Sequence, residues 1–171
     1  AKAARIPDDR TLEFRLLTRH RWRLINLCGD VQRFAHSLIE RIFPEYADVF
    51  SRPLLPTSCA LIRELGLSPA ALASHPEDLS ALIRRVSRGQ VTQATIRTLL
   101  DRASQSIGIG RAETVIVDQL RSVISLIETI ESQIASLDQE LARRVEALRS
   151  TLPSLGIHAP LAATIHAESD P

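Results

Sequence analysis

Residues 111–152 read RAETVIVDQLRSVISLIETIESQIASLDQELARRVEALRSTL. One apolar row repeats every seven residues, and a second row keeps the same period until Arg144 interrupts it. The rows are Leu120, Ile127, Ile134, Leu141 and Leu148, and Ile116, Val123, Ile130 and Leu137. Apolar rows of period seven predict a long helix with a coiled-coil seam, whereas a strand would alternate with period two. At about 1.5 Å per residue, this helix is on the order of 60 Å long.

A second heptad pattern runs from about Asp9 to Phe43. Its first row is Leu17, Leu24, Val31 and Leu38, and a second row, three residues later in each heptad, is His20, Leu27 and Phe34. We expect a second coiled-coil helix, with His20 as a polar residue that sets the register of the seam. Asp8 or Asp9, after Pro7, is suited to cap its start, and Pro44 ends it.

Residues 44–110 form a compact insert between the two long helices. Short helices are predicted over residues 57–65, 69–74, 77–88 and 92–107, opened by Ser68 and Thr92 and closed by Gly66, Gly89 and Gly108. The fold class is therefore all-α: two long coiled-coil helices, 9–43 and 111–152, that flank a small helical insert. Residues 1–8 are expected to end a linker from an upstream domain, and residues 153–171 to start a downstream domain.

Composition agrees with a helical protein whose core is aliphatic. Apolar residues make up 44% of the chain and aromatic residues only 4%, and the net charge is +1. No apolar run approaches the roughly 20 residues that span a membrane, so no membrane partner is expected. The cysteines, Cys28 and Cys59, belong to no CxxC pair, which gives no zinc ribbon or disulfide framework and weakly suggests a reducing compartment. We expect a cytoplasmic protein.

The sequence assigns no metal site and no catalytic residue to this chain. His20, Cys28 and His36 are spaced by eight residues, whereas ligands lie side by side on a helix at spacings of three or four. Ser58 and Cys59 have no histidine at a spacing typical of a nucleophilic site.

Two basic clusters are candidates for nucleic-acid binding. The first is Arg19, Arg21, Trp22 and Arg23, and the second is Arg84, Arg85 and Arg88. If Leu17 and Leu24 are seam positions, Trp22 points away from the seam, where an indole flanked by arginines is suited to stack on a base.

Each cluster has a simpler reading as well. Trp22 would equally pack against a neighbouring domain, and cations near a helix C-terminus are favourable on dipole grounds alone. Lys2 is the only lysine, and arginine suits phosphate recognition, but a bias in base composition explains the same imbalance.

The tail contains a turn of small residues, Leu155-Gly156-Ile157-His158-Ala159-Pro160. It looks like the hairpin of a helix-hairpin-helix, in which the amides at the start of the second helix hold a phosphate. A generic helix-turn-helix connection would look similar.

These segments together resemble the IS-one-ten family of insertion-sequence transposases, DEDD RuvC-like recombinases related to the Piv-type DNA invertases. The similar stretches, in the family's order and spacing, are residues 16–24 (LLTRHRWRL), 42–50 (IFPEYADVF), 82–89 (LIRRVSRG), 103–108 (ASQSIG) and 161–168 (LAATIHAE). The Phe-Pro-Glu-Tyr stretch and the Ala-Ala-Thr-Ile tail are the most specific of them. At residues 155–159 the chain lacks the second glycine and both prolines of the family pattern, Pro-Gly-Ile-Gly-Pro.

The resemblance implies that this chain is the middle region of such a transposase. An RuvC-like domain with four acidic residues, which would bind Mg²⁺ or another divalent metal, would precede it, and a domain with a nucleophilic serine would follow. The family's RNA-guided recombinases assemble as dimers and tetramers on an element-encoded RNA and DNA. This chain would then supply oligomerisation, as a homodimer or tetramer through the coiled coil, and part of the nucleic-acid cradle.

The sequence alone leaves open two hypotheses that assign the chain to other classes of protein. One is a non-enzymatic coiled-coil scaffold with a helical insert. The other is a free-standing helix-hairpin-helix DNA-binding module, which needs a basic surface around residues 84–111.

Overall fold

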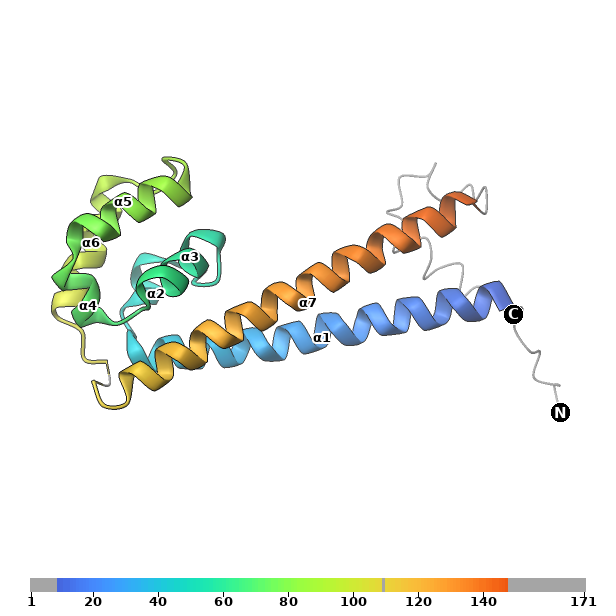
Figure 1. The fold of residues 1–171 in the computed structure, drawn as a ribbon, viewed down its shortest axis with the longest axis horizontal. Helices are drawn as coiled ribbons and strands as arrows, with labels where there is room; N and C mark the ends of the chain where they lie inside the picture. Colours follow the sequence, from blue (N-terminus) through green and yellow to red (C-terminus); the bar gives the residue numbers. More distant parts are fainter. Residues whose placement is uncertain (1–8, 109, 148–171) are drawn as a thin grey trace. The chain divides into compact units, whose positions relative to one another are not determined.

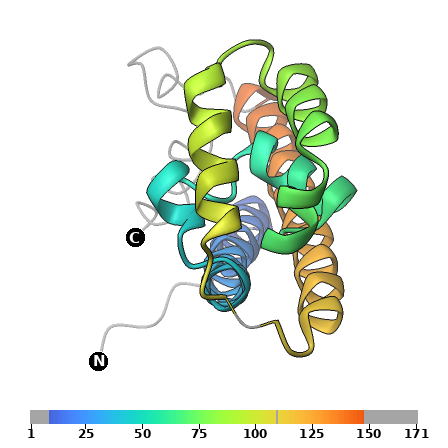
Figure 2. The same ribbon diagram turned by 90° about the vertical axis from the view of Figure 1, so that its left-hand side faces the viewer.

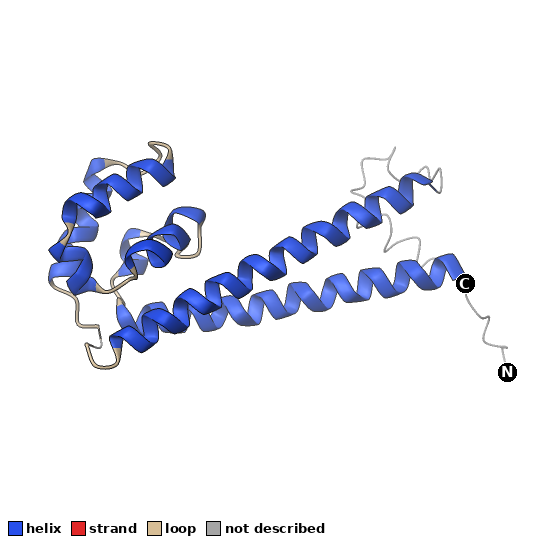
Figure 3. Ribbon diagram, in the orientation of Figure 1, coloured by secondary structure: helices blue, strands red, loops and turns tan. Residues whose placement is uncertain are grey.

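The computed structural model describes residues 9–108 and 110–147. Every regular element in that part of the chain is an α-helix, which confirms the predicted all-α fold (Figure 3). The expected linker at residues 1–8 and the expected downstream segment at residues 153–171, with its hairpin turn, lie outside the described residues. Coiled-coil pairing of the two long helices stays a prediction.

Both long helices begin close to the predicted positions, and α1 also ends close to its predicted end. Helix α1 covers Asp9–Ile42 with 34 residues, and helix α7 covers Glu113–Ala147 with 35 residues (Figure 1). Pro44 follows the last turn of α1, where it cannot donate the amide that another turn would need. The predicted continuation of the second helix to residue 152 passes beyond the described part of α7.

Five short helices lie between α1 and α7. They are α2 (Tyr46–Val49), α3 (Pro56–Leu65), α4 (Pro69–Ser74), α5 (Pro76–Ser87) and α6 (Gln93–Ser104). Helix α2 was not predicted, because a single turn of four residues shows no periodicity. Helix α6 ends at Ser104, well before the predicted stop at Gly108.

Side-chain caps start two of these helices as predicted. The Ser68 hydroxyl accepts a hydrogen bond from the amide of Ala71 at 3.2 Å, and the Thr92 hydroxyl accepts one from the amide of Thr95 at 3.2 Å. Each cap satisfies an amide that the first helical turn leaves without a partner. The end of α5 differs from the prediction, since Arg88 adopts the left-handed conformation with φ +50° one residue before Gly89.

The chain divides into two units, which we describe separately. The first contains the described residues up to Gly29 and those from Glu128 onward, and the second contains Asp30–Ile127. The first unit therefore consists of the N-terminal part of α1 and the C-terminal part of α7.

Ion pairs show that the two helix segments of the first unit run antiparallel. Arg21 on α1 pairs with Asp138 on α7, and Glu13 pairs with Arg144, so later residues of α7 lie beside earlier residues of α1. Phe14, Leu24, Leu141 and Val145 are buried within this unit.

The predicted α7 rows are buried or half-buried at every described position, and so is the first row of α1, Leu17, Leu24, Val31 and Leu38. The second predicted row of α1 is not buried in the described structure. His20, Leu27 and Phe34 are exposed, and the inward row is instead Phe14, Arg21, Cys28, Ala35 and Ile42. On a helix, positions three residues after the first row lie on one side of it, and positions four residues after it lie on the other side. The row that contains Arg21 follows the first row by four residues, and it is the row that faces α7. Within the first unit, Arg21 and not His20 is the polar residue of α1 that pairs with α7.

The core of the second unit forms where the short helices pack in pairs. Helix α4 packs against α6 and α3 packs against α5, as the end view shows (Figure 2). Fully buried aliphatic side chains fill the space between these helices: Leu61, Ile62, Leu67, Leu72, Leu79, Ile83, Ile96 and Leu99. Phe43, Tyr46 and Phe50 add an aromatic row, with ring centroids 5.8 Å and 5.0 Å apart.

Glu45 joins the beginning of the insert to its end. Its carboxylate accepts a hydrogen bond from the Ser106 hydroxyl at 2.6 Å and one from the Ile107 amide at 3.1 Å. Gly108 lies so close to α1 that a Cβ atom there would be 1.8 Å from the carbonyl oxygen of Ile42. Residues 42–50 and 103–108 thus meet in the second unit.

Candidate nucleic-acid interface

The first basic cluster lies on α1 in the first unit, and the structure brings three of its four residues together. Arg19 precedes Trp22 by three residues and Arg23 by four, the spacings that place side chains next to one another on a helix. All three are exposed, and Trp22, at 66%, is the most exposed large apolar residue of the first unit's described part. Trp22 is thus exposed within the described first unit, whereas its orientation relative to a coiled-coil seam stays a prediction.

Arg21 does not belong to this surface. Its guanidinium faces α7, where Nε and Nη2 donate to the two carboxylate oxygens of Asp138. Its side chain is 28% exposed, and its charge is compensated within the chain. A phosphate group would have to displace Asp138 to reach it.

Arg15 and Asn26 extend the exposed face of α1 in both directions. Arg15 is half-buried and lies seven residues before Trp22, whereas Asn26 is exposed and lies four residues after it. Helical spacing therefore places a guanidinium and an amide at the two ends of the Arg19, Trp22 and Arg23 surface. In the sequence these two residues lie seven positions before and four positions after Trp22, outside the run of alternating arginines at residues 19–23.

The second basic cluster lies at the end of α5 in the second unit, and two of its three cations have partners in the chain. Arg84 donates from Nη2 to the side-chain oxygen of Gln93 at 2.9 Å, and Arg85 pairs with Glu64. Arg88 is exposed and forms the left-handed C-cap of the helix. Glu64 compensates the charge of Arg85, whereas Gln93 is neutral, so Arg84 and Arg88 keep uncompensated guanidinium groups. This cluster has no aromatic residue comparable to Trp22, and it is therefore the weaker candidate.

No group of three or more histidine, cysteine, aspartate or glutamate residues gathers in a metal-binding arrangement within residues 9–108 and 110–147. His20 is exposed and Cys28 is buried. Burial, and next the charge of Glu131, raise the pKa of the Cys28 thiol, which keeps it protonated and unreactive. In the same part of the chain, no helix is long and apolar enough to cross a membrane.

Comparison with known proteins gives no relative for this chain. No family model, no curated protein and no solved structure matches it.

Proposed function

We propose that this chain is the oligomerising, nucleic-acid-cradling middle region of a DNA transposase or recombinase of a mobile element, working with an element-encoded guide RNA. The observation that carries the proposal is the surface of Arg19, Trp22 and Arg23 on α1. An indole exposed to this extent has no packing role within the described part of the unit, and two arginines beside it suit a phosphate backbone. The resemblance in residues 16–24 falls on this same surface.

The chemistry of strand cleavage would belong to other parts of the parent protein. A divalent metal such as Mg²⁺ would be held by the acidic residues of a preceding RuvC-like domain, not by this chain. The same proposal places the protein in the cytoplasm, where it would encounter a guide RNA and target DNA together.

Self-association is the second element of the proposal. On α1 in the first unit, Leu12, Leu16 and Leu27 are 47%, 60% and 47% exposed. Steps of four and eleven residues place them on one face of the helix, away from the Arg21 row. Large apolar side chains that line up on an exposed helix face favour a second helix, here that of another copy of the chain.

A salt-dependent binding titration tests the nucleic-acid role. Fluorescence anisotropy would follow labelled duplex DNA and single-stranded RNA at several salt concentrations, with the wild-type chain and with the double variant Arg19→Ala, Arg23→Ala. Each phosphate contact releases counterions, so the slope of log affinity against log salt should fall by about one unit per arginine removed. Arg97→Ala, which removes an exposed cation from α6, is the matched control and should leave the slope unchanged.

A non-enzymatic coiled-coil scaffold is the second candidate. It is favoured by the contacts that Arg21, Arg84 and Arg85 make within the chain, which engage three of the seven predicted contact residues, although Arg84 and Arg85 stay exposed. Self-association with no measurable affinity for DNA or RNA at about 50 mM salt would select this candidate. The third candidate, a helix-hairpin-helix module, depends on a turn that lies outside the described residues.

A further inference from the structure

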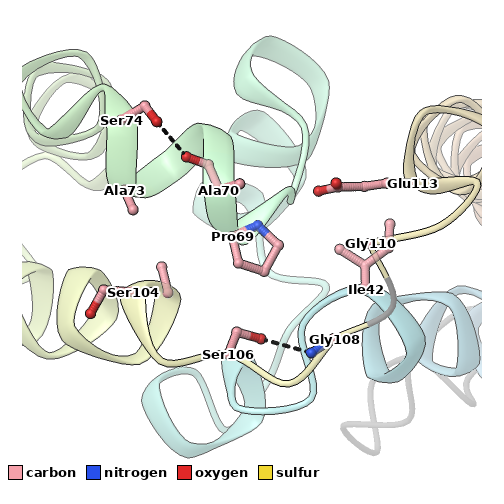
Figure 4. Close-up of a pocket in the computed structure, with 11 residues that line it drawn as sticks. Ile42, Pro69, Ala70, Ala73, Ser74, Ser104, Ser106, Gly108, Gly110 and Glu113 are labelled. Atoms are coloured by element: carbon pink, nitrogen blue, oxygen red, sulfur yellow. Dashed lines mark hydrogen bonds between the residues drawn. The ribbon is translucent and has the colours of Figure 1, made fainter.

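The second unit contains a cavity of about 480 Å³ where α4, the end of α6 and the first residue of α7 come together. Small residues leave this space open: Pro69, Ala70 and Ala73 from α4, Ala103 and Ser104 from α6, and Gly108 and Gly110 from the following loop. Figure 4 shows the Glu113 carboxylate directed from α7 toward Pro69 of α4. Glu113 is the one charged residue among the described residues that line the cavity.

One carboxylate oxygen of Glu113, Oε1, is buried and has no hydrogen-bond partner in the described part of the chain. A buried carboxylate oxygen without a donor is destabilising, because it has lost water and gained nothing in exchange. Such an oxygen in the wall of a cavity is therefore suited to receive a hydrogen-bond donor that also carries positive charge.

The serine hydroxyl groups around the cavity already donate hydrogen bonds to other acceptors in the chain. The Ser74 hydroxyl donates to the Ala70 carbonyl at 2.8 Å, that of Ser104 donates to the Asp101 carbonyl at 2.8 Å, and that of Ser106 donates to Glu45 at 2.6 Å. The Ser106 oxygen also accepts from the Gly108 amide at 3.2 Å, and each serine oxygen keeps at least one lone pair for a further donor. The side-chain polar groups of the cavity thus offer acceptors and no free hydroxyl donor.

We propose that this cavity binds a small organic cation whose head group is a primary ammonium or a guanidinium. The head group would donate to Glu113 and to a serine oxygen, while its carbon chain would lie against Ala73, Ala103 and Pro69. A divalent metal ion fits less well, since it prefers several oxygen ligands including more than one carboxylate. The proposal is independent of the nucleic-acid role, because no residue of either basic cluster lines the cavity.

Titration of the 171-residue chain with agmatine and with 1,4-diaminobutane tests this site, with chemical shifts or thermal stability as the readout. Sodium chloride at equal ionic strength and uncharged 1,4-butanediol are the ligand controls. A capped Ala-Arg-Ala tripeptide, run in parallel, shows whether the guanidinium is accepted on a peptide backbone or only on a small free molecule.

Two variants remove the site in different ways. Glu113→Gln keeps the size of the side chain and removes its charge, and Ala73→Leu fills the cavity while leaving the carboxylate in place. Glu77→Gln is the matched control, an exposed glutamate in the first turn of α5 that does not line the cavity.

We expect saturable binding of at least one cation to the wild type and to Glu77→Gln, and affinity at least tenfold weaker for both Glu113→Gln and Ala73→Leu. Circular dichroism melts show that each variant is folded before it is scored. No saturable binding by the wild type below about 10 mM, or equal affinity of the wild type and Glu113→Gln, would overturn the proposal.

Discussion

Arg21 on α1 and Asp138 on α7 form a two-point ion pair inside the first unit, in a row that is otherwise apolar. Eight residues earlier on α1, Glu13 pairs with Arg144, which also binds Glu140 on its own helix. Such pairs favour the observed register, because a shift by one heptad would break both of them. The pairs therefore select the antiparallel register of the two segments.

A double-mutant cycle on Arg21 and Asp138 measures that selection. Both side chains are about one-third exposed, so Arg21→Ala and Asp138→Ala should each lower the free energy of unfolding by about 1 kcal/mol, with a coupling energy near 0.5–1 kcal/mol. The same cycle on Arg33 and Asp30, an exposed pair within α1, should give a coupling close to zero. Urea unfolding at pH 7 gives both values, and equal coupling in the two cycles would contradict the register argument.

Substitutions at Gly108 and Gly110 can be compared to test whether the loop that contains them contacts α1. A Cβ at residue 108 would overlap the Ile42 carbonyl, whereas a Cβ at residue 110 would meet nothing within 4 Å. Gly108→Ala should therefore lower the free energy of unfolding by about 2–3 kcal/mol. Gly110→Ala should be neutral or slightly stabilising, by up to about 1 kcal/mol, because alanine restricts the unfolded chain. Thermal melts that fail to separate the two variants would show that the loop does not contact α1 in this way.

The hydrogen bonds at Glu45 predict a pH-dependent stability. Burial raises the pKa of this carboxyl, but the hydrogen bonds from Ser106 and Ile107 and the charge of Arg102 outweigh it, so the pKa is lowered from its ordinary value of 4.5. The folded state then binds fewer protons than the unfolded state, so this contribution is complete above pH 4.5 and is lost as pH falls through the lowered pKa. Wild type should be more stable than Glu45→Gln at pH 7, and the difference should shrink below pH 4.5. Urea titrations from pH 7 to pH 3, with Glu77→Gln as control, check this; a difference that is constant across the range would contradict it.

Trp22→Ala separates nucleic-acid binding from packing. If the indole stacks on a base, its loss should weaken binding of single-stranded RNA by about 1–3 kcal/mol and leave the melting temperature of the chain unchanged. Trp22→Phe should retain part of the affinity, since a phenyl ring also stacks. A lower melting temperature of a longer chain that includes the proposed upstream domain, with unchanged affinity, would assign Trp22 to a domain interface instead.

The exposed leucines of α1 predict where the chain self-associates. Leu16→Gln with Leu27→Gln should reduce the apparent mass in light scattering at about 100 μM, well above ordinary complex affinities. Helix content should be unchanged, because both positions are exposed in the described unit. Leu126→Gln, an exposed leucine of α7 in the second unit, is the control. A wild-type chain that stays monomeric at this concentration would remove the oligomerisation claim.

The long helices could be predicted from the sequence because their apolar pattern repeats over many turns. Leu120, Val123, Ile127 and Ile130 recur at alternating steps of three and four residues, and no other regular structure buries that pattern. The caps at Ser68 and Thr92 were readable for a related reason, since each is a short hydroxyl residue one or two positions before an amphipathic run.

The second buried row of α1 could not be predicted from the sequence, because it is determined by contacts with α7, which lies far away in the sequence. Leu27 and Phe34 are more apolar than Arg21 and Ala35, and a prediction from periodicity alone therefore assigns Leu27 and Phe34 to the buried row. Arg21 faces inward only because Asp138, 117 residues later, compensates its charge. The Glu113 cavity was hidden for the same reason, as it is built from small residues on three separate segments that carry no pattern.

The bond between Glu45 and Ser106 closes 61 residues of chain into a loop whose two ends lie within hydrogen-bond distance. In polymer terms, the free energy of closing such a loop grows only with the logarithm of its length. Residues can then be added to or removed from the surface turns between α2 and α6 without moving the two points where the loop joins its neighbours. Natural variation in length, and engineered insertion of a reporter domain, should therefore concentrate in these turns.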